Sequence, residues 1–282
     1  MIGPNMKTLI ALDIDGTLTS DLHALPQEVQ SYLERLTQLG VIVVLITGRC
    51  FSLAYPPLAN WNFPFLLAVH NGAVILQMPE KKIISEQYID PSVIGALEEI
   101  VNDKETDFSL YTSIKNEDIC YYRPLRYSSK LREYVDMRSK LCRENWVAVE
   151  NYATLPLSSL AAIKFFGDKE SSHRIKLQVE NKLSLHIPVI RDPIDQSVYI
   201  AQATHPDIDK GTAVDKILNG EERFVIAAGD DLNDLPMLTR ANLKIVMGSA
   251  PEELKRVADV VAKPAEELGI IEALENARHH WI

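Results

Sequence analysis

The sequence has little cysteine, and the cysteines that it has form no pattern. Cys50, Cys120 and Cys142 lie far apart in 282 residues. An odd number of cysteines without a Cys-x-x-Cys pair argues against a disulfide framework and does not indicate a zinc site. We therefore expect three reduced, partly buried thiols.

Long apolar runs are absent too. No stretch of about 18 uncharged apolar residues occurs, which is the length that a membrane-spanning helix needs. The first residues, MIGPNMK, have neither the basic region nor the apolar core of a signal peptide. We therefore expect a cytoplasmic protein that does not engage a membrane.

Positive charge is scarce. The chain contains 29 Lys and Arg against 39 Asp and Glu, a net charge of −10, and its sequence pI is near 5.2. This balance argues against nucleic acid as the main partner, and an acidic chain that binds an anion needs cations. The rest of the composition, 46% hydrophobic and 24% charged, is that of a globular protein and excludes collagen-like and disordered classes.

What the sequence does contain is a series of short apolar runs that end in polar turns. Apolar runs without polar alternation predict buried parallel strands, and helical spacing between them predicts connecting helices. The predicted strands occupy residues 8–12, 41–46, 65–69, 224–228, 244–247 and 259–262, and predicted helices occupy 26–40, 211–218 and 235–239. This order predicts an α/β fold with a Rossmann-like, doubly wound parallel sheet.

A change of composition interrupts this series of apolar runs. After a helical segment at residues 93–101, the chain becomes more polar, with mixed charges and scattered tyrosines, until about residue 202. The simplest explanation is one core domain built from residues 1–84 and 204–282, with an inserted domain at residues 85–203.

Acidic residues follow two of the predicted strands. Asp13 and Asp15 come directly after the first, and Asp230, Asp231 and Asp234 follow the strand at 224–228. Because ligands of open parallel sheets bind outside the carboxyl ends of the strands, we expect these carboxylates to converge. Converging carboxylates repel unless a cation lies between them, and Mg²⁺ prefers such oxygen ligands. The alternative is an ordinary solvated Asp-x-Asp-Gly turn.

A calcium-binding loop is a third explanation, and the spacing excludes it. Counted from Asp13, the sixth position holds Leu18 where an EF-hand needs glycine, and the twelfth holds Ala24 where it needs glutamate. Counted from Asp231, the sixth position is Pro236. Mg²⁺ therefore stays the expected cation.

Four short motifs occur in order at predicted strand or helix ends. They are Asp-Ile-Asp-Gly-Thr (13–17), Thr-Gly-Arg (47–49), Asp-Lys-Gly (209–211) and Gly-Asp-Asp-Leu-Asn-Asp (229–234). Together they closely resemble the haloacid dehalogenase-like (HAD) phosphatase superfamily. The wider pattern, with His-Asn-Gly-Ala (70–73) and Val-Met-Gly-Ser-Ala-Pro (246–251), resembles its Cof-type branch. That resemblance implies that the inserted domain is an α/β cap domain.

The resemblance implies a role for each acid. Asp13 would be the nucleophile, and Asp15 would protonate the leaving oxygen and then deprotonate the attacking water. Mg²⁺ would be held by Asp13, the main-chain carbonyl of Asp15, Asp230 and Asp234, the last either directly or through water. Asp231 occupies a variable position in the family and is not expected to be a ligand.

The same resemblance implies a set of phosphate-binding residues. Thr47, the backbone N–H of Gly48, and Lys210 would hold phosphoryl oxygens. Taken without the family pattern, Thr47 is equally a helix cap and Lys210 a surface lysine at the start of a helix.

Three further polar residues lie next to these motifs. Asn233 is expected to orient Lys210 or a substrate oxygen, Asn71 to face the substrate, and Arg49 to reach an anion. The alternatives are turn residues with left-handed backbone for both asparagines, and a surface ion pair for Arg49.

One part of the inserted domain is strongly basic. Residues 121–143 interleave seven basic residues with four tyrosines and two acids. Such a mixture favours either a phosphorylated or nucleotide-like ligand or a solvated helix face. The basic residues are Arg123, Arg126, Lys130, Arg132, Arg138, Lys140 and Arg143.

We therefore expect a Mg²⁺-dependent phosphatase of small phosphorylated metabolites, with sugar phosphates as the leading substrate class. The reaction would pass through an aspartyl-phosphate, because a carboxylate nucleophile divides a difficult hydrolysis into two steps. A phosphomutase of related architecture and a non-catalytic ligand-binding regulator are the alternatives. The sequence indicates no oligomeric state.

Overall fold

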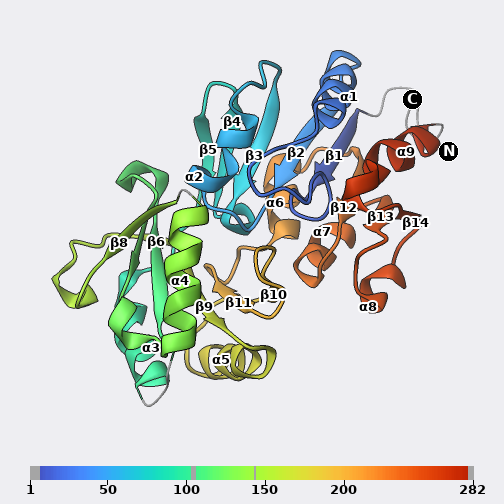
Figure 1. Ribbon diagram of the computed structural model, residues 1–282. Helices are drawn as coiled ribbons and strands as arrows, with labels where there is room; N and C mark the ends of the chain where they lie inside the picture. The colour runs from blue at the N-terminus through green and yellow to red at the C-terminus, as the bar shows by residue number, and fades with distance from the viewer. Residues whose placement is uncertain (1–6, 103–105, 143, 279–282) are drawn as a thin grey trace. The chain divides into compact units, whose positions relative to one another are not determined.

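The computed structural model describes residues 7–102, 106–142 and 144–278 (Figure 1). The chain divides into two compact units. The first consists of Met1–Gly48, Pro56–Glu86 and Asp209–Ile282, and the second of Arg49–Tyr55 and Gln87–Ile208. The predicted boundaries lie a few residues before the crossings at Glu86 and Ile208. The short segment Arg49–Tyr55, which the contacts place in the second unit, has no counterpart in the predicted division.

The first unit is built on a sheet with the order β14-β13-β12-β1-β2-β3-β4-β5. Neighbouring strands are parallel from β14 to β3, as predicted, and β4 and β5 continue the sheet as antiparallel strands. The strands are β1 (Thr8–Leu12), β2 (Ile42–Ile46), β3 (Phe65–Val69), β4 (Val74–Met78), β5 (Lys82–Glu86), β12 (Phe224–Gly229), β13 (Leu243–Met247) and β14 (Val260–Ala262).

Helices pack against both faces of this sheet. Leu9 and Ala11 of β1 share one apolar cluster with Val214 and Leu238, whereas Ile10 and Leu12 are equally buried and point the other way. Both faces of β1 are therefore covered, as in a doubly wound fold. The helices of the first unit are α1 (Gln27–Gln38), α6 (Lys210–Leu218), α7 (Leu235–Leu238), α8 (Glu252–Lys255) and α9 (Gly269–Asn276).

The second unit has its own six-stranded sheet, in the order β10-β11-β9-β6-β7-β8. Phe165 in β9 belongs to the apolar cluster that contains Leu97 of α3 and Val179 of α5, whereas the adjacent Phe166 packs with Val135 of α4. Both faces of this sheet are thus buried by helices. The elements are β6 (Phe108–Thr112), β7 (Ile119–Tyr122), β8 (Asn145–Ala148), β9 (Leu160–Gly167), β10 (Val189–Arg191), β11 (Tyr199–Ala203), α2 (Phe51–Ala54), α3 (Ile94–Val101), α4 (Ser129–Leu141) and α5 (Lys169–Lys182).

The basic segment 121–143 is largely a structural element of this unit. Arg123 is buried and donates to Asp107 Oδ2 at 2.8 Å, and Arg138 is buried with its Nη1 2.6 Å from Asp192 Oδ2. Lys130 is exposed, as a solvated face predicts. Arg143 lies outside the described residues. Neither sequence-based explanation accounts for the two buried arginines, which neutralise buried carboxylates.

Within the described part of the chain, no helix is both long enough and apolar enough to span a bilayer.

Candidate active site

The sheet order of the first unit brings three motif-bearing strand ends together. β1 lies between β12 and β2, and all three strands run in the same direction. Their carboxyl ends lead into Asp13, Asp230 and Thr47, respectively. The N–H of Asp13 donates to the carbonyl of Ala228 at 3.0 Å, which extends the pairing of β1 and β12 by one residue.

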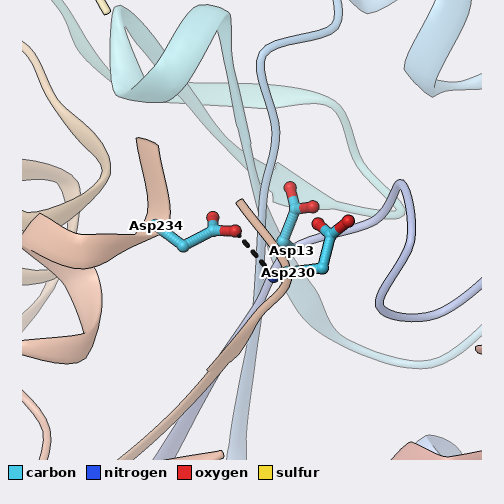
Figure 2. Close-up of side chains that lie close together, drawn as sticks. All are labelled: Asp13, Asp230 and Asp234. Atoms are coloured by element: carbon cyan, nitrogen blue, oxygen red, sulfur yellow. Dashed lines mark hydrogen bonds between the residues drawn. The ribbon is translucent and has the colours of Figure 1, made fainter. Parts of the chain in front are cut away.

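Three carboxylates converge at this edge of the sheet. Asp13, Asp230 and Asp234 each offer an oxygen within 4.8 Å of the others. Figure 2 shows the carboxylates of Asp13 and Asp230 side by side, with Asp234 reaching in from the following turn. Asp13 and Asp234 are buried, and Asp230 is half-buried. The solvated-turn alternative for the first motif is therefore wrong for Asp13.

Lys210 is a member of the same cluster. Its Nζ lies 2.5 Å from Asp13 Oδ1 and 2.6 Å from Asp234 Oδ1, and the residue is only 1% exposed. Lys210 is the first residue of α6, which begins with a capping box formed by Asp209 and Thr212. That box fixes the start of the helix and thereby the point from which the lysine extends. The surface-lysine alternative is wrong.

The turn after β12 holds Asp234 from its own backbone. Asp234 Oδ2 accepts the N–H groups of Asp230 at 2.9 Å and Asp231 at 3.0 Å, and the first of these bonds is dashed in Figure 2. Asp231 instead caps the short 3₁₀ turn Leu232–Asp234, because its Oδ1 accepts the N–H of Leu232 at 2.7 Å. The capping contact gives Asp231 a structural task outside the carboxylate cluster.

Burial dominates the electrostatics of the cluster. It raises the pKa of Asp13, which Lys210 lowers and the neighbouring Asp234 and Asp15 raise. Burial also raises the pKa of Asp230 well above its ordinary value, and Asp13 adds to this effect. Burial would lower the pKa of Lys210, but Asp13 and Asp234 outweigh it and raise that pKa. The lysine ammonium is thus held charged among acids that repel one another.

The donor set fits a hard divalent cation. Three carboxylate oxygens within 4.8 Å of one another match the oxygen ligands that Mg²⁺ takes. Burial, and then repulsion between the neighbouring carboxylates, raises the pKa values of Asp13 and Asp230. HAD-like hydrolases generally use a divalent metal, and this buried cluster is where the chain offers ligands for one.

Two glycines make room for these carboxylates. Gly16 has a φ of +72°, and a Cβ built on it would lie 2.1 Å from Asp230 Oδ2. A Cβ on Gly229 would lie 2.4 Å from the Cβ of Asp234. Neither glycine was given a role from the sequence. The glycine of Gly-Asp-Asp, at the end of a predicted strand, could have indicated a close approach of another group to the backbone at Gly229.

Asp15 lies in the turn that follows β1. It is half-buried, and the turn is closed by the N–H of Gly16 donating to the carbonyl of Thr19 at 2.8 Å. Its charge contributes to the raised pKa of Asp13, so the two carboxylates are close enough to interact. Asp15 is not a member of the three-carboxylate cluster.

Thr47 and Asn71 are joined through the backbone. Thr47 is fully buried, its N–H donates to the carbonyl of Ala68 at 2.9 Å, and its carbonyl accepts the N–H of Asn71 at 2.8 Å. Asn71 has a φ of +58°, so the left-handed alternative for this residue is confirmed. Its Oδ1 also accepts from Asn233 Nδ2 at 3.4 Å, a contact that the sequence analysis did not anticipate. The N-cap residue of α2 is Cys50, so Thr47 is not the cap of this helix.

Arg49 differs from the other motif residues. It is buried, and its contacts place it in the second unit, whereas Gly48 belongs to the first. Arg49 is only 4% exposed, so the alternative of a surface position for this residue is wrong.

An α/β sheet with acids and a threonine at adjacent strand ends, and a buried lysine at the start of a helix, defines the class of phosphoryl-transfer hydrolases that the motifs resemble. Comparison with known proteins agrees. The family model for haloacid dehalogenase-like hydrolases matches residues 10–274. The phosphoglycolate phosphatase of Methanopyrus kandleri is 27% identical over 261 residues, which are 91% of this chain and 90% of that protein. The 5-amino-6-(5-phospho-D-ribitylamino)uracil phosphatase YcsE of Bacillus subtilis is 23% identical, over 97% of this chain and 95% of its own length.

Solved structures agree as well. The crystal structure of a haloacid dehalogenase-like hydrolase from Bacteroides thetaiotaomicron superposes with a TM-score of 0.75 at 25% identity, covering 96% of this chain and 99% of its own. The chain belongs to the haloacid dehalogenase-like hydrolases, in their Cof-type branch. It is a phosphatase.

Proposed function

We propose that the protein is a Mg²⁺-dependent phosphatase of small phosphorylated metabolites that works through an aspartyl-phosphate on Asp13. The observation that carries this proposal is the buried cluster in which Lys210 bridges Asp13 and Asp234 while Asp230 lies beside Asp13. A nucleophilic carboxylate must stay ionised in a buried place. Lys210, which lowers the pKa of Asp13, favours the ionised form.

The chemistry assigned to the chain's own residues has two stages. Asp13 attacks phosphorus, the bond to the leaving oxygen breaks, and Asp15 gives its proton to that oxygen. Water then attacks the phosphorus of the acyl phosphate, Asp15 takes the proton from this water, and inorganic phosphate and free Asp13 result. Thr47, the N–H of Gly48, and Lys210 hold the phosphoryl oxygens through both stages. Asn233, which is hydrogen-bonded to Asn71, orients Lys210 or a substrate oxygen.

Asp13, the carbonyl of Asp15, Asp230 and Asp234 are the residues that would hold the metal. When bound, Mg²⁺ would offset negative charge on the transferring phosphoryl group. Both oxygens of Asp234 already accept hydrogen bonds, Oδ1 from Lys210 and Oδ2 from the N–H groups of Asp230 and Asp231. This arrangement favours ligation by Asp234 through a water molecule over direct ligation.

Sugar phosphates are the substrate class that we propose. The relative named for a phosphorylated ribityl compound acts, by its name, on a phosphate attached to a polyol chain, which is chemically close to a sugar phosphate. The relative named phosphoglycolate phosphatase points to a smaller phosphorylated acid, so a panel should contain both kinds. Release of inorganic phosphate without isomerisation of the sugar phosphate would distinguish a phosphatase from the phosphomutase alternative.

The direct test is Asp13→Asn. Because the substitution removes the nucleophile but keeps the size of the side chain, we expect phosphate release from sugar phosphates to fall by about 1,000-fold or more. Relief of charge repulsion within the cluster should leave the thermal midpoint unchanged or raised.

The matched control is Asp21→Asn, which changes an exposed aspartate a few residues further on and should keep wild-type turnover. Near-normal turnover by Asp13→Asn would refute the proposed mechanism.

A further inference from the structure

Two helices of the first unit carry Lys210 and Asp234, and the space between them decides whether the two side chains meet. Lys210 is the first residue of α6, and Asp234 is the N-cap residue of α7. Lys210 Nζ lies 2.6 Å from Asp234 Oδ1. A small slide or rotation of α6 against α7 would therefore move the lysine ammonium group away from this carboxylate.

α7 cannot fix this position by itself. It has four residues, and a helix of one turn is not stable without partners. Its Met237 and Leu238 are buried in the apolar cluster that also contains Ala213 and Val214 of α6. Apolar burial holds the two helices together but is not directional, so their relative rotation and height depend on other contacts.

Arg240, which follows α7, supplies directional contacts to both helices. Its Nε donates to Asp215 Oδ2 of α6 at 2.6 Å, and its Nη1 donates to the carbonyl of Pro236 in α7 at 2.9 Å. Because the guanidinium group is planar and rigid, two bonds from this one group fix the distance and the angle between the helices. The ion pair is partly exposed, so it contributes more to geometry than to net stability.

Gly211 allows α6 and α7 to approach this closely. A Cβ built on Gly211 would lie 2.5 Å from the carbonyl oxygen of Pro236 and closer still to Arg240 Nη1. Any side chain at this position would therefore push the helices apart. Gly211 directly follows Lys210, so this close contact between the helices lies beside the lysine.

We propose that Arg240 is a positioning residue for Lys210, which acts by joining α6 to α7 and thereby holding the Lys210 ammonium group at Asp234. This inference rests on the proposed function, in which Lys210 holds phosphoryl oxygens. An ammonium group that is fixed before the phosphate arrives binds it without an ordering cost and faces the transferring group in the correct place. Arg240 acts on the phosphate only through the lysine.

The test compares variants of the full-length chain in Mg²⁺, with p-nitrophenyl phosphate as substrate and inorganic phosphate as inhibitor. In Arg240→Ala we expect kcat/KM to fall about 10-fold and the phosphate Ki to rise about 5-fold, the scale for a lost supporting contact. Arg240→Lys keeps the charge but lacks the planar fork, so it should recover less than about half of either loss.

Arg223→Ala is the matched control. Arg223 pairs with Glu221 just before β12, at the end of that strand away from the carboxylate cluster. Loss of this ion pair should cost about as much stability as Arg240→Ala does, and should leave kcat/KM and Ki within about 1.5-fold of the wild type. Equal constants in wild type and Arg240→Ala, or equal losses in Arg223→Ala and Arg240→Ala, would overturn the inference.

A double-mutant cycle with Lys210→Met separates the inference from the proposed function. If Arg240 acts through the lysine, Arg240→Ala should raise the phosphate Ki in the wild-type background but not in Lys210→Met. An equal rise in both backgrounds would refute the positioning role alone. An unchanged Ki in Lys210→Met by itself would refute the proposed role of the lysine, so the two ideas fail on different results.

Asp215→Ala covers the case in which Arg240→Ala does not fold. The Asp215 side chain is 53% exposed, and alanine is the best helix former, so this variant should keep the fold of α6. It removes the partner of Arg240 on α6, and we expect the phosphate Ki to rise about threefold in the wild-type background and to stay unchanged in Lys210→Met. If Arg240→Ala does not fold, an unchanged Ki in Asp215→Ala overturns the inference.

Discussion

Gly16 is the residue on which the geometry of the carboxylate cluster depends most directly. Its φ of +72° lies in the region that favours glycine, and a Cβ there would lie 2.1 Å from Asp230 Oδ2. Gly16→Ala must therefore strain the turn and displace the carboxylate of Asp230. We expect kcat to fall by about 10- to 100-fold, the scale for a shifted supporting contact at a metal or catalytic group.

Gly40→Ala is the matched control for this prediction. Gly40 has a comparable φ of +85°, but nothing lies within 4 Å of the Cβ that alanine would add. This variant should lose about 1 kcal/mol of unfolding free energy from backbone strain and keep full turnover. Steady-state kinetics and denaturant unfolding of both variants check the prediction, and equal kcat losses would show that strain alone explains the effect.

At the scale of single residues, sequence reasoning predicted which side chains gather but not how they are held. Asp13, Asp230 and Asp234 were predicted to converge because strand ends of a parallel sheet meet at one edge. The pairing of Asn71 with Asn233 and the hydrogen bond from the Ser52 N–H to Asp118 were not predicted. The partners are separated by 162 residues in the first case, and by 66 residues from Ser52 to Asp118 in the second. No local pattern carries such contacts.

The turn between β12 and α7 combines two adjacent aspartates with different tasks. Asp230 belongs to the carboxylate cluster, whereas Asp231 caps the turn through the N–H of Leu232. Asparagine caps as well as aspartate, so Asp231→Asn should change stability by less than about 1 kcal/mol and kcat by less than about threefold. Asp230→Asn, one residue earlier, should lower kcat by about 100-fold or more, because it removes a charge from the proposed metal site.

Kinetics at saturating and at limiting Mg²⁺ distinguish the two aspartates. Asp230→Asn should need more Mg²⁺ for half-maximal activity, and Asp231→Asn should match the wild type. If both variants need more Mg²⁺ than the wild type by a similar factor, Asp231 is also a ligand and its exclusion was wrong.

At the scale of elements, apolar runs predicted the parallel strands well because these strands are buried on both faces. β1 and β3 begin and end at the predicted residues, and β13 begins one residue earlier than predicted. The hairpin of β4 and β5 was not predicted. β5 alternates between exposed and half-buried residues, and both strands follow His-Asn-Gly (70–72), which was interpreted only as part of the family pattern. The basic segment was misjudged for another reason: charge in a sequence does not show that Arg123 and Arg138 are buried with carboxylate partners.

At the scale of the whole molecule, chain order and spatial grouping differ. An insertion at residues 85–203 was predicted because the composition of the chain differs there over more than a hundred residues. The segment Arg49–Tyr55 is too short to show a change of composition, and only its contacts place it in the second unit. More than half of the excess negative charge lies in residues 204–282, which carry nine basic and fifteen acidic side chains. Two of these acids, Asp230 and Asp234, belong to the carboxylate cluster.

The acidic cluster makes the first unit the part of the molecule whose stability should respond to metal. A ligand that binds only the folded state stabilises it by about 2.7 kcal/mol when present at 100 times its Kd. We therefore expect Mg²⁺ to raise the thermal midpoint and to slow amide exchange in β1 and β12, with little effect on β6 and β9. Asp230→Asn should abolish this response. The thermal midpoint of Asp230→Asn should also equal or exceed that of the metal-free wild type, because the variant lacks a carboxylate whose pKa is raised by burial and by Asp13.

NaCl at matched ionic strength is the control, since a chain of net charge −10 gains some stability from screening alone. An equal rise with NaCl, or in Asp230→Asn, would assign the effect to screening and remove the thermodynamic support for a specific cation at these three carboxylates.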